Sequence, residues 1–453
     1  MRDYQARPTA QVAGELTVPG DKSISHRSMM LAGICEGTTR VEGFLPSEDC
    51  LASRRAMQAL GVQVQIPARD TVIVHGVGLR GLKAAGRDLD MGNAGTAMRL
   101  FTGLLSGQRF DSRLVGDASL SRRPMERVAT PLRLMGARVS TTQGTPPVSI
   151  QGVERLVGIE YAMPVASAQV KSALLFAGLF ADSPTRVIEP AVSRDHSERM
   201  LESLGARIHT GGGRVELEPP SRLHARDLRV PGDFSSAAFF VVAGLIGAAP
   251  AGLLIRHVGM NPTRTGLLDI LRRMGADIRV MNPSAVGAEP VADLMVMRSE
   301  LRGIDVPPEL VPLAIDEFPA LFVAAACAAG ETRVSGAQEL RVKESDRIAV
   351  MAQGLRALGV EHEVFADGLH IAGRPSGAAL RAGVVDSHGD HRIAMSFAIA
   401  SLRAAGPILI HDTANVATSF PGFVDLARSV GLDLDEVAGS GALAGSGTPA
   451  SSG

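Results

Sequence analysis

The apolar positions along the chain form one repeating unit that occurs six times. Each copy has an amphipathic run that ends in an apolar-Gly-small pattern and is followed by alternating residues: QALGVQV, RLMGARV, ESLGARI, RRMGADI, RALGVEH and RSVGLDL. The glycines of these copies are Gly61, Gly136, Gly205, Gly275, Gly359 and Gly431. A glycine after a helical run is typical of a C-terminal cap, because it enters the left-handed region without a Cβ clash. The alternation that follows predicts a strand.

A second shared element precedes each of these runs. Six small, apolar segments predict helices that begin near DKSISHRSMMLAGI, GNAGTAMRLFTGLL, SAQVKSALLFAGLF, GDFSSAAFFVVAGLI, DEFPALFVAAACAAG and HGDHRIAMSFAIAS. Short strands such as TTRVEGF, PTRVIEP and ETRVSGA follow some of them. Each unit therefore predicts helix, strand, helix, strand, strand. Because the first helix is apolar nearly all round, we expect it to be buried against its counterparts.

Six units divide into three and three, which predicts two similar α/β domains. The phrase VPGD opens both the first and the fourth unit, at residues 18–21 and 230–233, so we expect crossovers near residues 20 and 232. Domain one would hold residues 1–20 and 232–436, and domain two residues 21–231. We expect a surface loop at 281–293 and a disordered Gly/Ser/Ala tail at 437–453. The repeats also allow a solenoid or propeller that binds a partner.

Length, composition and charge argue against several classes of function. A chain of 453 residues exceeds what one core usually serves. The net charge of −1 argues against a general binder of nucleic acid or membrane surfaces. Apolar stretches such as 237–251 are shorter than the roughly 20 residues of a membrane span. The 3 cysteines lack CxxC spacing, which argues against a disulfide framework or a Cys-rich zinc site. With no apolar run at the N-terminus, we expect a soluble, cytoplasmic protein.

Charged and polar residues stand where the apolar helices begin. At the first helix start, Ser23 and Arg27 are four apart and share one face, with Lys22 just before the turn. A helix N-terminus offers unpaired N–H groups and a partial positive charge. Added Lys, Ser and Arg side chains make this a candidate phosphate or carboxylate site. Taken alone, the same residues also describe a capped helix with exposed charges.

Similar clusters occur in the second, third, fifth and sixth units. Their candidate residues are Asn93, Gly95, Thr96, Arg123, Ser167, Ala168, Gln169, Arg194, Asp316, Lys343, Glu344, Arg347, His391 and Arg392. Singly, each cluster is also compatible with a solvated surface. Their shared position at helix starts instead predicts that these N-termini converge on one cleft that holds several anionic groups. No pair has metal-ligand spacing such as HExxH, so we expect no metal.

The motifs also resemble a known family. VPGDKSISHR, GNAGTAMR, GDASLSRRPM, ASAQVKSALL, RDHSERML, ELRVKESDRI and DHRIAMSF are similar in order and spacing to the motifs of EPSP synthases, over residues 10–436. The RDHSE and ASAQVKSA wordings resemble the second class of this family. The resemblance implies an inside-out α/β fold: two domains, each of three βαβαββ units, that close on substrate through two crossovers.

The resemblance further implies transfer of the enolpyruvyl group of phosphoenolpyruvate to the 5-hydroxyl of shikimate 3-phosphate, in the shikimate pathway, by a monomer that needs no cofactor. Shikimate 3-phosphate would be held by Lys22, Ser23, Arg27, Ser167, Ala168, Gln169, Arg194, Asp316 and Lys343. Phosphoenolpyruvate would be held by Lys22, Asn93, Gly95, Thr96, Arg123, Gln169, Lys343, Glu344, Arg347, His391 and Arg392.

The resemblance also assigns the chemistry. Asp316 would take the hydroxyl proton and Glu344 would handle the C3 proton, with Lys22 and Lys343 as electrostatic partners or alternative acids. Two positions depart from the family pattern. Ala168 stands where many members have a second Ser, and Thr418 stands where the enterobacterial type has a Lys, which removes one expected phosphoenolpyruvate cation.

Two alternatives remain. The related UDP-N-acetylglucosamine enolpyruvyl transferase would have Lys-Asn near the first helix and a catalytic Cys in a mobile loop. Here Lys22 is followed by Ser23, and Cys35 and Cys50 fall in or beside helical runs. A non-catalytic anion-binding scaffold is the second alternative. Acids such as Asp316 among the cations argue against it.

Overall fold

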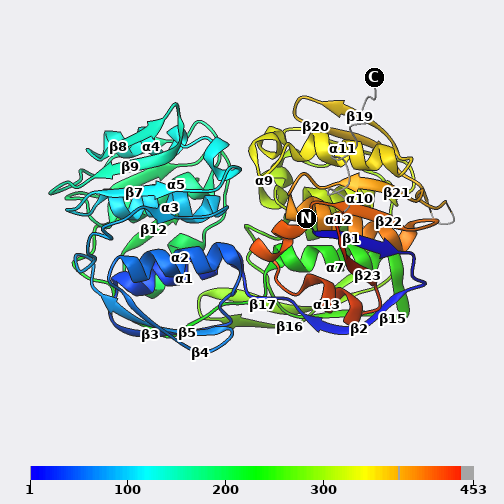
Figure 1. Ribbon diagram of the computed structural model, residues 1–453, viewed down its shortest axis with the longest axis horizontal. Helices are drawn as coiled ribbons and strands as arrows, with labels where there is room; N and C mark the ends of the chain where they lie inside the picture. Colours follow the sequence, from blue (N-terminus) through cyan, green and yellow to red (C-terminus); the bar gives the residue numbers. More distant parts are fainter. Residues whose placement is uncertain (1, 376–377, 440–453) are drawn as a thin grey trace, which may run out of the picture.

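The chain folds into two lobes that lie side by side (Figure 1). The computed structural model describes residues 2–375 and 378–439. One lobe has a core drawn from residues between Ile24 and Val230. The other has a core drawn from residues 4–18 together with residues 234–434. Because the two cores share no residue, we propose that the domains divide near residues 20 and 232.

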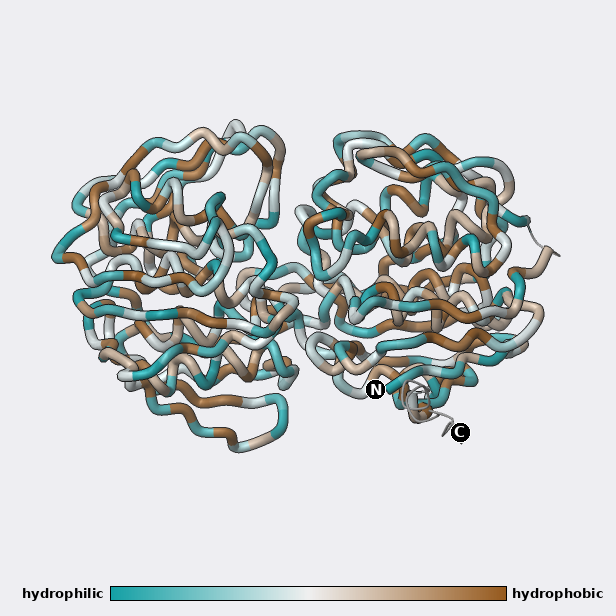
Figure 2. The backbone as a smooth tube through the Cα atoms, turned by 45° about the horizontal axis from the view of Figure 1, so that its top comes forward, coloured by the Kyte–Doolittle hydropathy of each residue, from teal (hydrophilic) through white to brown (hydrophobic). Residues whose placement is uncertain are grey.

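Each predicted apolar helix is present. They are α1 (Lys22–Ile34), α3 (Gly95–Ser106), α5 (Ala168–Gly178), α7 (Phe234–Gly247), α10 (Phe318–Ala326) and α12 (His391–Ala400). All 14 residues of α7 are buried, and brown, hydrophobic segments run through the interior of its lobe in Figure 2. A helix that is apolar all round must be covered on every side. Contacts such as those of α3 with α5 and of α10 with α7 and α12 confirm the prediction that these helices are buried against their counterparts.

The second helix of each unit lies outside the first. These helices are α2 (Glu48–Ala59), α4 (Glu126–Leu134), α6 (His196–Ser203), α8 (Gly266–Arg273), α11 (Arg347–Ala357) and α13 (Phe423–Ser429). A short extra helix, α9 (Val311–Ala314), precedes α10. The six capping glycines adopt positive φ angles between 74° at Gly359 and 102° at Gly431. The left-handed conformation expected of the repeat is therefore present at the end of every unit's second helix.

In the described part of the chain, six small sheets surround the helices, one for each unit. In domain two, the first sheet has the strand order β14 (Leu228–Arg229), β3 (Glu36–Glu42), β5 (Thr71–Val77), β4 (Gln63–Ala68). The second has the order β6 (Leu89–Asp90), β7 (Ser112–Val115), β9 (Thr145–Gln151), β8 (Arg138–Thr142). The third has the order β10 (Glu160–Ala162), β11 (Thr185–Ile188), β13 (Arg214–Leu217), β12 (Ile208–Gly211). In domain one, the first sheet has the strand order β16 (Ile278–Val286), β17 (Glu289–Val296), β15 (Ala248–Gly259), β2 (Val12–Thr17). The second has the order β18 (Glu331–Val334), β20 (Gly368–Ala372), β19 (Glu361–Phe365). The third has the order β21 (Gly383–Asp386), β22 (Ile408–His411), β1 (Arg2–Arg7), β23 (Asp433–Ala438). Sheets outside and helices inside give the predicted inside-out α/β fold.

Each domain closes on itself through a strand from a distant part of the chain. In domain two, β14 pairs in parallel with β3 of the first unit. In domain one, β2 pairs in parallel with β15, and β1 lies between β22 and β23. The N-terminal strands therefore complete two sheets of domain one.

Two expectations need correction. The predicted surface loop at 281–293 is instead a long β-hairpin, in which β16 and β17 pair antiparallel from Ile278↔Val296 to Val286↔Glu289. The polar, Gly- and Pro-containing sequence suggested a loop, but the strand pairing resumes after a shift of register between Met281 and Ser284. Strand β23 runs to Ala438, two residues past the expected end of the folded chain. The rest of the predicted tail, 440–453, lies outside the described residues.

The two crossovers run alongside each other. Gly20 and Gly232 form an antiparallel bridge, the amide of Asp21 donates to Pro231 O at 2.8 Å, and the amide of Asp233 donates to Pro19 O at 2.8 Å. A Cβ on Gly20 would lie 1.8 Å from Gly43 O, so only glycine permits this approach. The segments that join the domains are thus themselves hydrogen-bonded. Within the described ranges, no helix has the length and apolar character to cross a membrane.

Candidate active site

Two adjoining cavities lie where the domains face each other. The smaller, of about 70 Å³, is lined by Lys22, Ser23, Asp49, Gly95, Thr96, Arg99, Arg123, Arg127, Gln169, Arg194, Asp233, Ser235, Arg264, Asp316, Val342, Lys343, Glu344 and Arg392. The larger, of about 160 Å³, shares Arg127, Gln169, Arg194, Asp316 and Lys343 with it and adds, among others, Ser167, Ala168 and Glu339. Residues at the starts of all six apolar helices, or directly before them, line these cavities.

The start of α1 brings a lysine to the smaller cavity. Asp21 caps the helix by accepting a hydrogen bond from the amide of Ile24 at 2.9 Å. Lys22 follows directly and places its Nζ 3.1 Å from Asp49 Oδ2. Burial raises the pKa of Asp49, and the charge of Lys22 opposes this rise. The lysine is thus held at the cavity by a carboxylate that the sequence analysis did not single out.

Asp316 lies at the centre of the cavity wall contributed by domain one. It accepts a hydrogen bond from Arg194 of domain two, and its Oδ1 is 3.2 Å from Lys343 Nζ and 3.4 Å from Arg347 Nη1. Burial works to raise the pKa of Asp316. Arg194, Lys343 and the other cations outweigh burial and hold the pKa well below its ordinary value. Asp316 is therefore ionised at neutral pH, and its ion pair with Arg194 joins the two domains.

Glu344 is another carboxylate that domain one contributes to the smaller cavity. Its Oε2 accepts a hydrogen bond from Arg347 at 2.6 Å, and its Oε1 is 3.6 Å from Arg123 Nη1 of domain two. Burial would raise the pKa of this carboxyl. Arg347, Arg123 and further positive charges such as Lys22 together outweigh burial and keep the pKa well below its ordinary value. In the free protein Glu344 is consequently a carboxylate, able to accept a proton.

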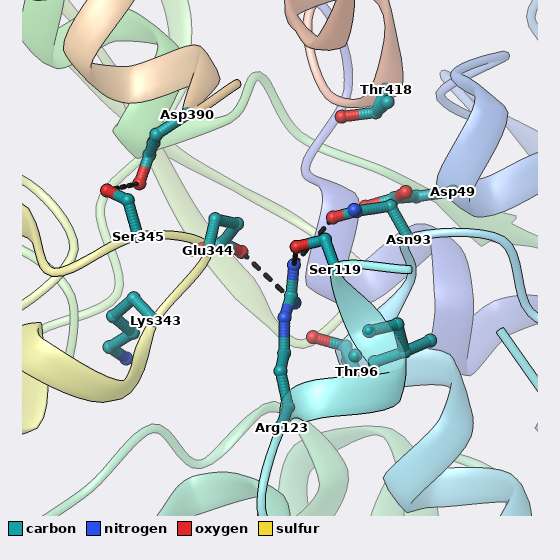
Figure 3. A network of polar contacts seen from close by, with 12 residues as sticks. Asp49, Asn93, Thr96, Ser119, Arg123, Lys343, Glu344, Ser345, Asp390 and Thr418 are labelled. Atoms are coloured by element: carbon teal, nitrogen blue, oxygen red, sulfur yellow. Dashed lines mark hydrogen bonds and ion pairs between the residues drawn. The ribbon is translucent and has the colours of Figure 1, made fainter. Parts of the chain in front are cut away.

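Arg123 is oriented from several sides (Figure 3). Its Nη2 donates to Asn93 Oδ1 at 2.6 Å and to Ser119 Oγ at 3.4 Å, while its other terminal nitrogen points toward Glu344. A Cβ on Gly95 would lie 2.9 Å from Arg123 Nη1. The glycine at the start of α3 therefore leaves the space that the guanidinium occupies.

Gln169 connects two helix starts of domain two. Its Oε1 accepts a hydrogen bond from Arg99 at 2.8 Å, and its Nε2 donates to Thr96 Oγ1 at 2.9 Å. Ser167 caps α5 by accepting from the amide of Val170 at 3.4 Å. These bonds fix the orientation of the amide between the two cavities.

Residues at the start of α12 reach the same region from domain one. Arg392 donates to the backbone O of Asp316 at 2.9 Å and lines the smaller cavity. His391 is buried, and its Nε2 has no hydrogen-bond partner. Burial, followed by the charge of Lys22, lowers the pKa of His391 well below its ordinary value. The ring is therefore neutral.

Four of the expected substrate-binding residues do not line either cavity. Arg27, a residue of α1, is buried and donates to Ser197 Oγ and Ser172 Oγ at 2.8 Å each. Asn93 and Arg347 contact residues that line the cavity, and His391 is buried where the charges of Lys22 and Glu344 affect its pKa. As substrate ligands these four remain predictions.

Several cavity residues were missed by sequence reasoning. They are Asp49, Arg99, Arg127, Asp233, Ser235 and Arg264. Arg127 forms an ion pair of 3.0 Å with Glu339 of the other domain. One signal was available for Arg264: the fourth unit lacks a cation at the start of its apolar helix, and Arg264 lies in the same unit. Within residues 2–375 and 378–439, no group of His, Cys, Asp or Glu side chains is placed to hold a metal ion.

Comparisons with solved structures identify the fold. An EPSP synthase from Acinetobacter baumannii matches with a TM-score of 0.86 and 51% identity, covering 97% of this chain and 100% of that one. The enolpyruvyl transferase NikO from Streptomyces tendae matches with a TM-score of 0.74 at 18% identity, over 96% and 99% of the two chains, which shows the fold alone. The fold is that of the enolpyruvyl transferases.

Sequence relatives narrow this class to one family. The family model of EPSP synthase (3-phosphoshikimate 1-carboxyvinyltransferase) matches residues 6–426. A 3-phosphoshikimate 1-carboxyvinyltransferase from Methylococcus capsulatus is 57% identical over 433 residues, 95% of this chain and 98% of that protein. One from Legionella pneumophila is 51% identical, over 96% and 100%. The chain belongs to the EPSP synthase family.

Proposed function

We propose that this protein transfers the enolpyruvyl group of phosphoenolpyruvate to the 5-hydroxyl of shikimate 3-phosphate, with release of phosphate. The observation that carries the proposal is the set of cations and carboxylates that the two domains bring to one pair of cavities. Lys22, Arg123 and Arg194 come from domain two, and Lys343 and Arg392 from domain one. Each substrate carries a phosphate and a carboxylate, so bringing both together in a confined cavity requires several cations to offset their repulsion.

The two cavities suggest where each substrate binds. The larger cavity contains Ser167, Ala168 and Arg194, which we assign to shikimate 3-phosphate. The smaller one contains Gly95 and Arg392, which we assign to phosphoenolpyruvate. Residues common to both cavities, such as Lys343, would then lie between the reacting groups. Closure of the domains would exclude water and align the reactants.

The carboxylates supply the proton transfers. Asp316 would accept the proton of the 5-hydroxyl as its oxygen attacks C2 of phosphoenolpyruvate, while C3 gains a proton. In the tetrahedral adduct, the bond from C2 to the phosphate oxygen then breaks and C3 loses a proton, which gives the enolpyruvyl ether and phosphate. We assign Glu344 to the C3 proton. A bound anionic substrate would raise its pKa, so that Glu344 can donate the proton that C3 gains and take it back from the adduct, while the departing phosphate takes up the proton held by Asp316.

The cysteines speak against the related UDP-N-acetylglucosamine transferase. Burial raises the pKa of Cys35 to about 12 and also raises the pKa of Cys50. Both thiols are buried and neither lies at the cavities. A cytoplasmic location and a monomeric state remain predictions. Sedimentation of the purified protein would test the latter.

The first experiment is phosphate release from phosphoenolpyruvate, with and without shikimate 3-phosphate. Wild type should release phosphate only with both substrates, and Glu344→Gln should lower kcat by about 10²- to 10⁴-fold. Glu361→Gln, an exposed carboxylate on β19, is the matched control and should behave as wild type. No release with shikimate 3-phosphate would contradict the proposal, and release with UDP-N-acetylglucosamine would favour the alternative transferase.

A further inference from the structure

Arg264 is a buried cation to which neither proposed substrate site assigns a role. It lies between β15 and α8 in domain one, and only 3% of its side chain is exposed. The side chain lines the smaller cavity close to the two crossovers. Its contacts extend in two directions, toward both domains.

On one side, Arg264 contacts the start of α1 in domain two. Its Nη1 is 3.6 Å from Asp21 Oδ2. Asp21 caps α1 through the amide of Ile24 and directly precedes Lys22. Because the cap fixes the first turn of the helix, a displacement of Asp21 would displace Lys22 as well.

On the other side, Arg264 contacts the start of α7 in domain one. Its Nη2 donates to Ser235 Oγ at 2.6 Å and to Asp233 Oδ1 at 3.1 Å. Ser235 in turn donates to the buried carboxylate of Glu317, and Glu317 Oε1 is 3.8 Å from Arg392 Nη1. A continuous chain of polar contacts therefore joins Arg264 to Arg392.

We propose that Arg264 is a positioning residue for phosphoenolpyruvate, because it fixes Lys22 of domain two relative to Arg392 of domain one through Asp21 and through Ser235 and Glu317. This inference rests on the proposed function, in which Lys22 and Arg392 bind that substrate. Arg392 is assigned to phosphoenolpyruvate alone, whereas Lys22 is assigned to both substrates. Loss of Arg264 should therefore weaken phosphoenolpyruvate binding more than shikimate 3-phosphate binding.

The charges around Arg264 explain why this position needs a guanidinium. Asp21 and Asp233 cap helices of different domains, and the same side chain contacts both. Burial works to raise the pKa of Asp21, but Arg264, His196 and the hydrogen bond from the Ile24 amide together outweigh burial and hold that pKa below its ordinary value. Without Arg264, two buried carboxylates from opposite domains would repel each other. A lysine supplies one compact charge and lacks the planar fork that reaches three oxygens at once.

The test is steady-state kinetics with each substrate varied in turn, for wild type and four variants. Arg264→Met should raise KM for phosphoenolpyruvate by about tenfold and KM for shikimate 3-phosphate by less than about threefold. Ser235→Ala, which removes a single hydroxyl, should shift the ratio of the two KM values in the same direction by about threefold. The double variant should match Arg264→Met, since both changes interrupt one chain of contacts. Arg264→Lys should be intermediate.

A matched control distinguishes positioning from a general loosening of the domain contact. Arg199 of domain two also contacts domain one, because it donates to the backbone O of Ala288 at 3.1 Å, but within the described residues it makes no hydrogen bond or ion pair with Lys22 or Arg392. Arg199→Met should leave the KM ratio unchanged.

The outcomes separate this inference from the proposed function. If wild type releases no phosphate, the proposed function itself fails. If wild type is active and the variants raise both KM values equally, or raise neither, the role of Arg264 is overturned while the proposed function stands. If Arg264→Met does not fold, Ser235→Ala decides, because it keeps Arg264 and both carboxylates. An unchanged KM ratio in Ser235→Ala would then overturn the inference.

Discussion

Lys171 and Arg347 are each buried between carboxylates, and of these two clusters only that of Arg347 reaches the candidate active site. In the core of domain two, Lys171 Nζ lies 2.8 Å from Glu189 and 2.6 Å from Glu198. In domain one, Arg347 contacts Glu344 at 2.6 Å and Asp390 at 2.8 Å. Lys171 and Arg347 each expose only 1% of the side chain.

The clusters differ in what lies around them. The partners of Lys171 all belong to domain two, and Lys171 lines neither cavity. The cluster around Arg347 reaches the cavities through Glu344 and Asp316, and each of these also pairs with an arginine of the other domain. A buried ion pair is therefore not in itself evidence of a site. Sharing its carboxylates across the domain boundary is what allows a cluster to respond to substrate and closure.

Asp316→Asn is the strongest test of this comparison. It removes the carboxylate that contacts Arg194 and Lys343, so we expect kcat to fall by about 10³-fold. The free energy of unfolding should change much less, because water can reach the cations through the cavity. Phosphate release and urea unfolding should be measured on the same preparation. A large loss of stability with normal turnover would place Asp316 with the structural cluster.

Lys171→Met should give the opposite result. It leaves Glu189 and Glu198 buried without their cation, which should lower the free energy of unfolding by about 3–5 kcal/mol. At a temperature where the variant is folded, kcat should stay within about tenfold of wild type. Lys83→Met, at an exposed lysine of the same domain, is the control and should unfold at the wild-type urea concentration. Collapse of activity without loss of stability would contradict the distinction between the clusters.

The pH dependence of stability gives a further test of the buried groups of domain two. It depends on His26, which lies in the core of this domain beside Ser53. Burial, followed by the charges of Lys22 and Arg27, lowers the pKa of His26 from 6.5 to about 3. Between these values the unfolded chain binds a proton that the folded chain does not, so stability is lost as the pH falls below about 6.5. At about 1.4 kcal/mol per pH unit, the loss reaches about 2 kcal/mol at pH 5.

His26→Asn removes this titration and keeps an acceptor for Ser53, whose Oγ lies 2.7 Å from the imidazole Nδ1. Its urea midpoint should therefore change less between pH 7 and pH 5 than that of wild type. The same pH dependence in both proteins would show that His26 takes up a proton while the chain is folded.

Of these substitutions, Gly95→Ala should cause the smallest change in free energy, and the change should affect substrate binding and not the stability of the fold. The added Cβ would lie 2.9 Å from Arg123 Nη1 and 3.2 Å from Arg99 Nη1. Both guanidiniums must move, so KM for phosphoenolpyruvate should rise by about tenfold, or about 1.4 kcal/mol, with an unchanged melting temperature. Gly211→Ala is the control, since nothing lies within 4 Å of a Cβ there. Unchanged kinetics would show that the arginines have room to adjust.

Most of the fold was predictable because its signals are local and repeated. A capping glycine such as Gly61 acts on its own helix, and an apolar helix such as α7 must be buried wherever it lies. The hairpin at 278–296 was missed because its first strand is exposed at most positions. Exposed strands lack the alternation of buried and polar residues on which sequence reasoning depends. The pairing with β17 holds this segment in place, and such pairing depends on tertiary structure.

The candidate site was predictable to the extent that its residues stand at helix starts. Lys22, Gly95 and Gln169 fall at corresponding places in different units, so the repeat itself indicates that they converge. Asp49 and Arg264 belong to other parts of their units. They reach the cavities only because two domains cross at residues 20 and 232. The repeated VPGD phrase predicted the crossing itself, but sequence periodicity carries no information about which residues away from the helix starts are brought to the cavities.

The placement of β1 and β2 also fixes the order in which the molecule can be completed during synthesis. Domain two is continuous, and its closing strand β14 emerges soon after the rest of that domain. Tyr4 in β1, by contrast, pairs with Ile410 and Glu436. At about 5–20 residues per second, the first strand to leave the ribosome waits about 20–90 s for its partners. Domain two should therefore fold first, and β2 can pair soon afterwards with β15, while β1 remains an unpaired strand until the end of the chain is made.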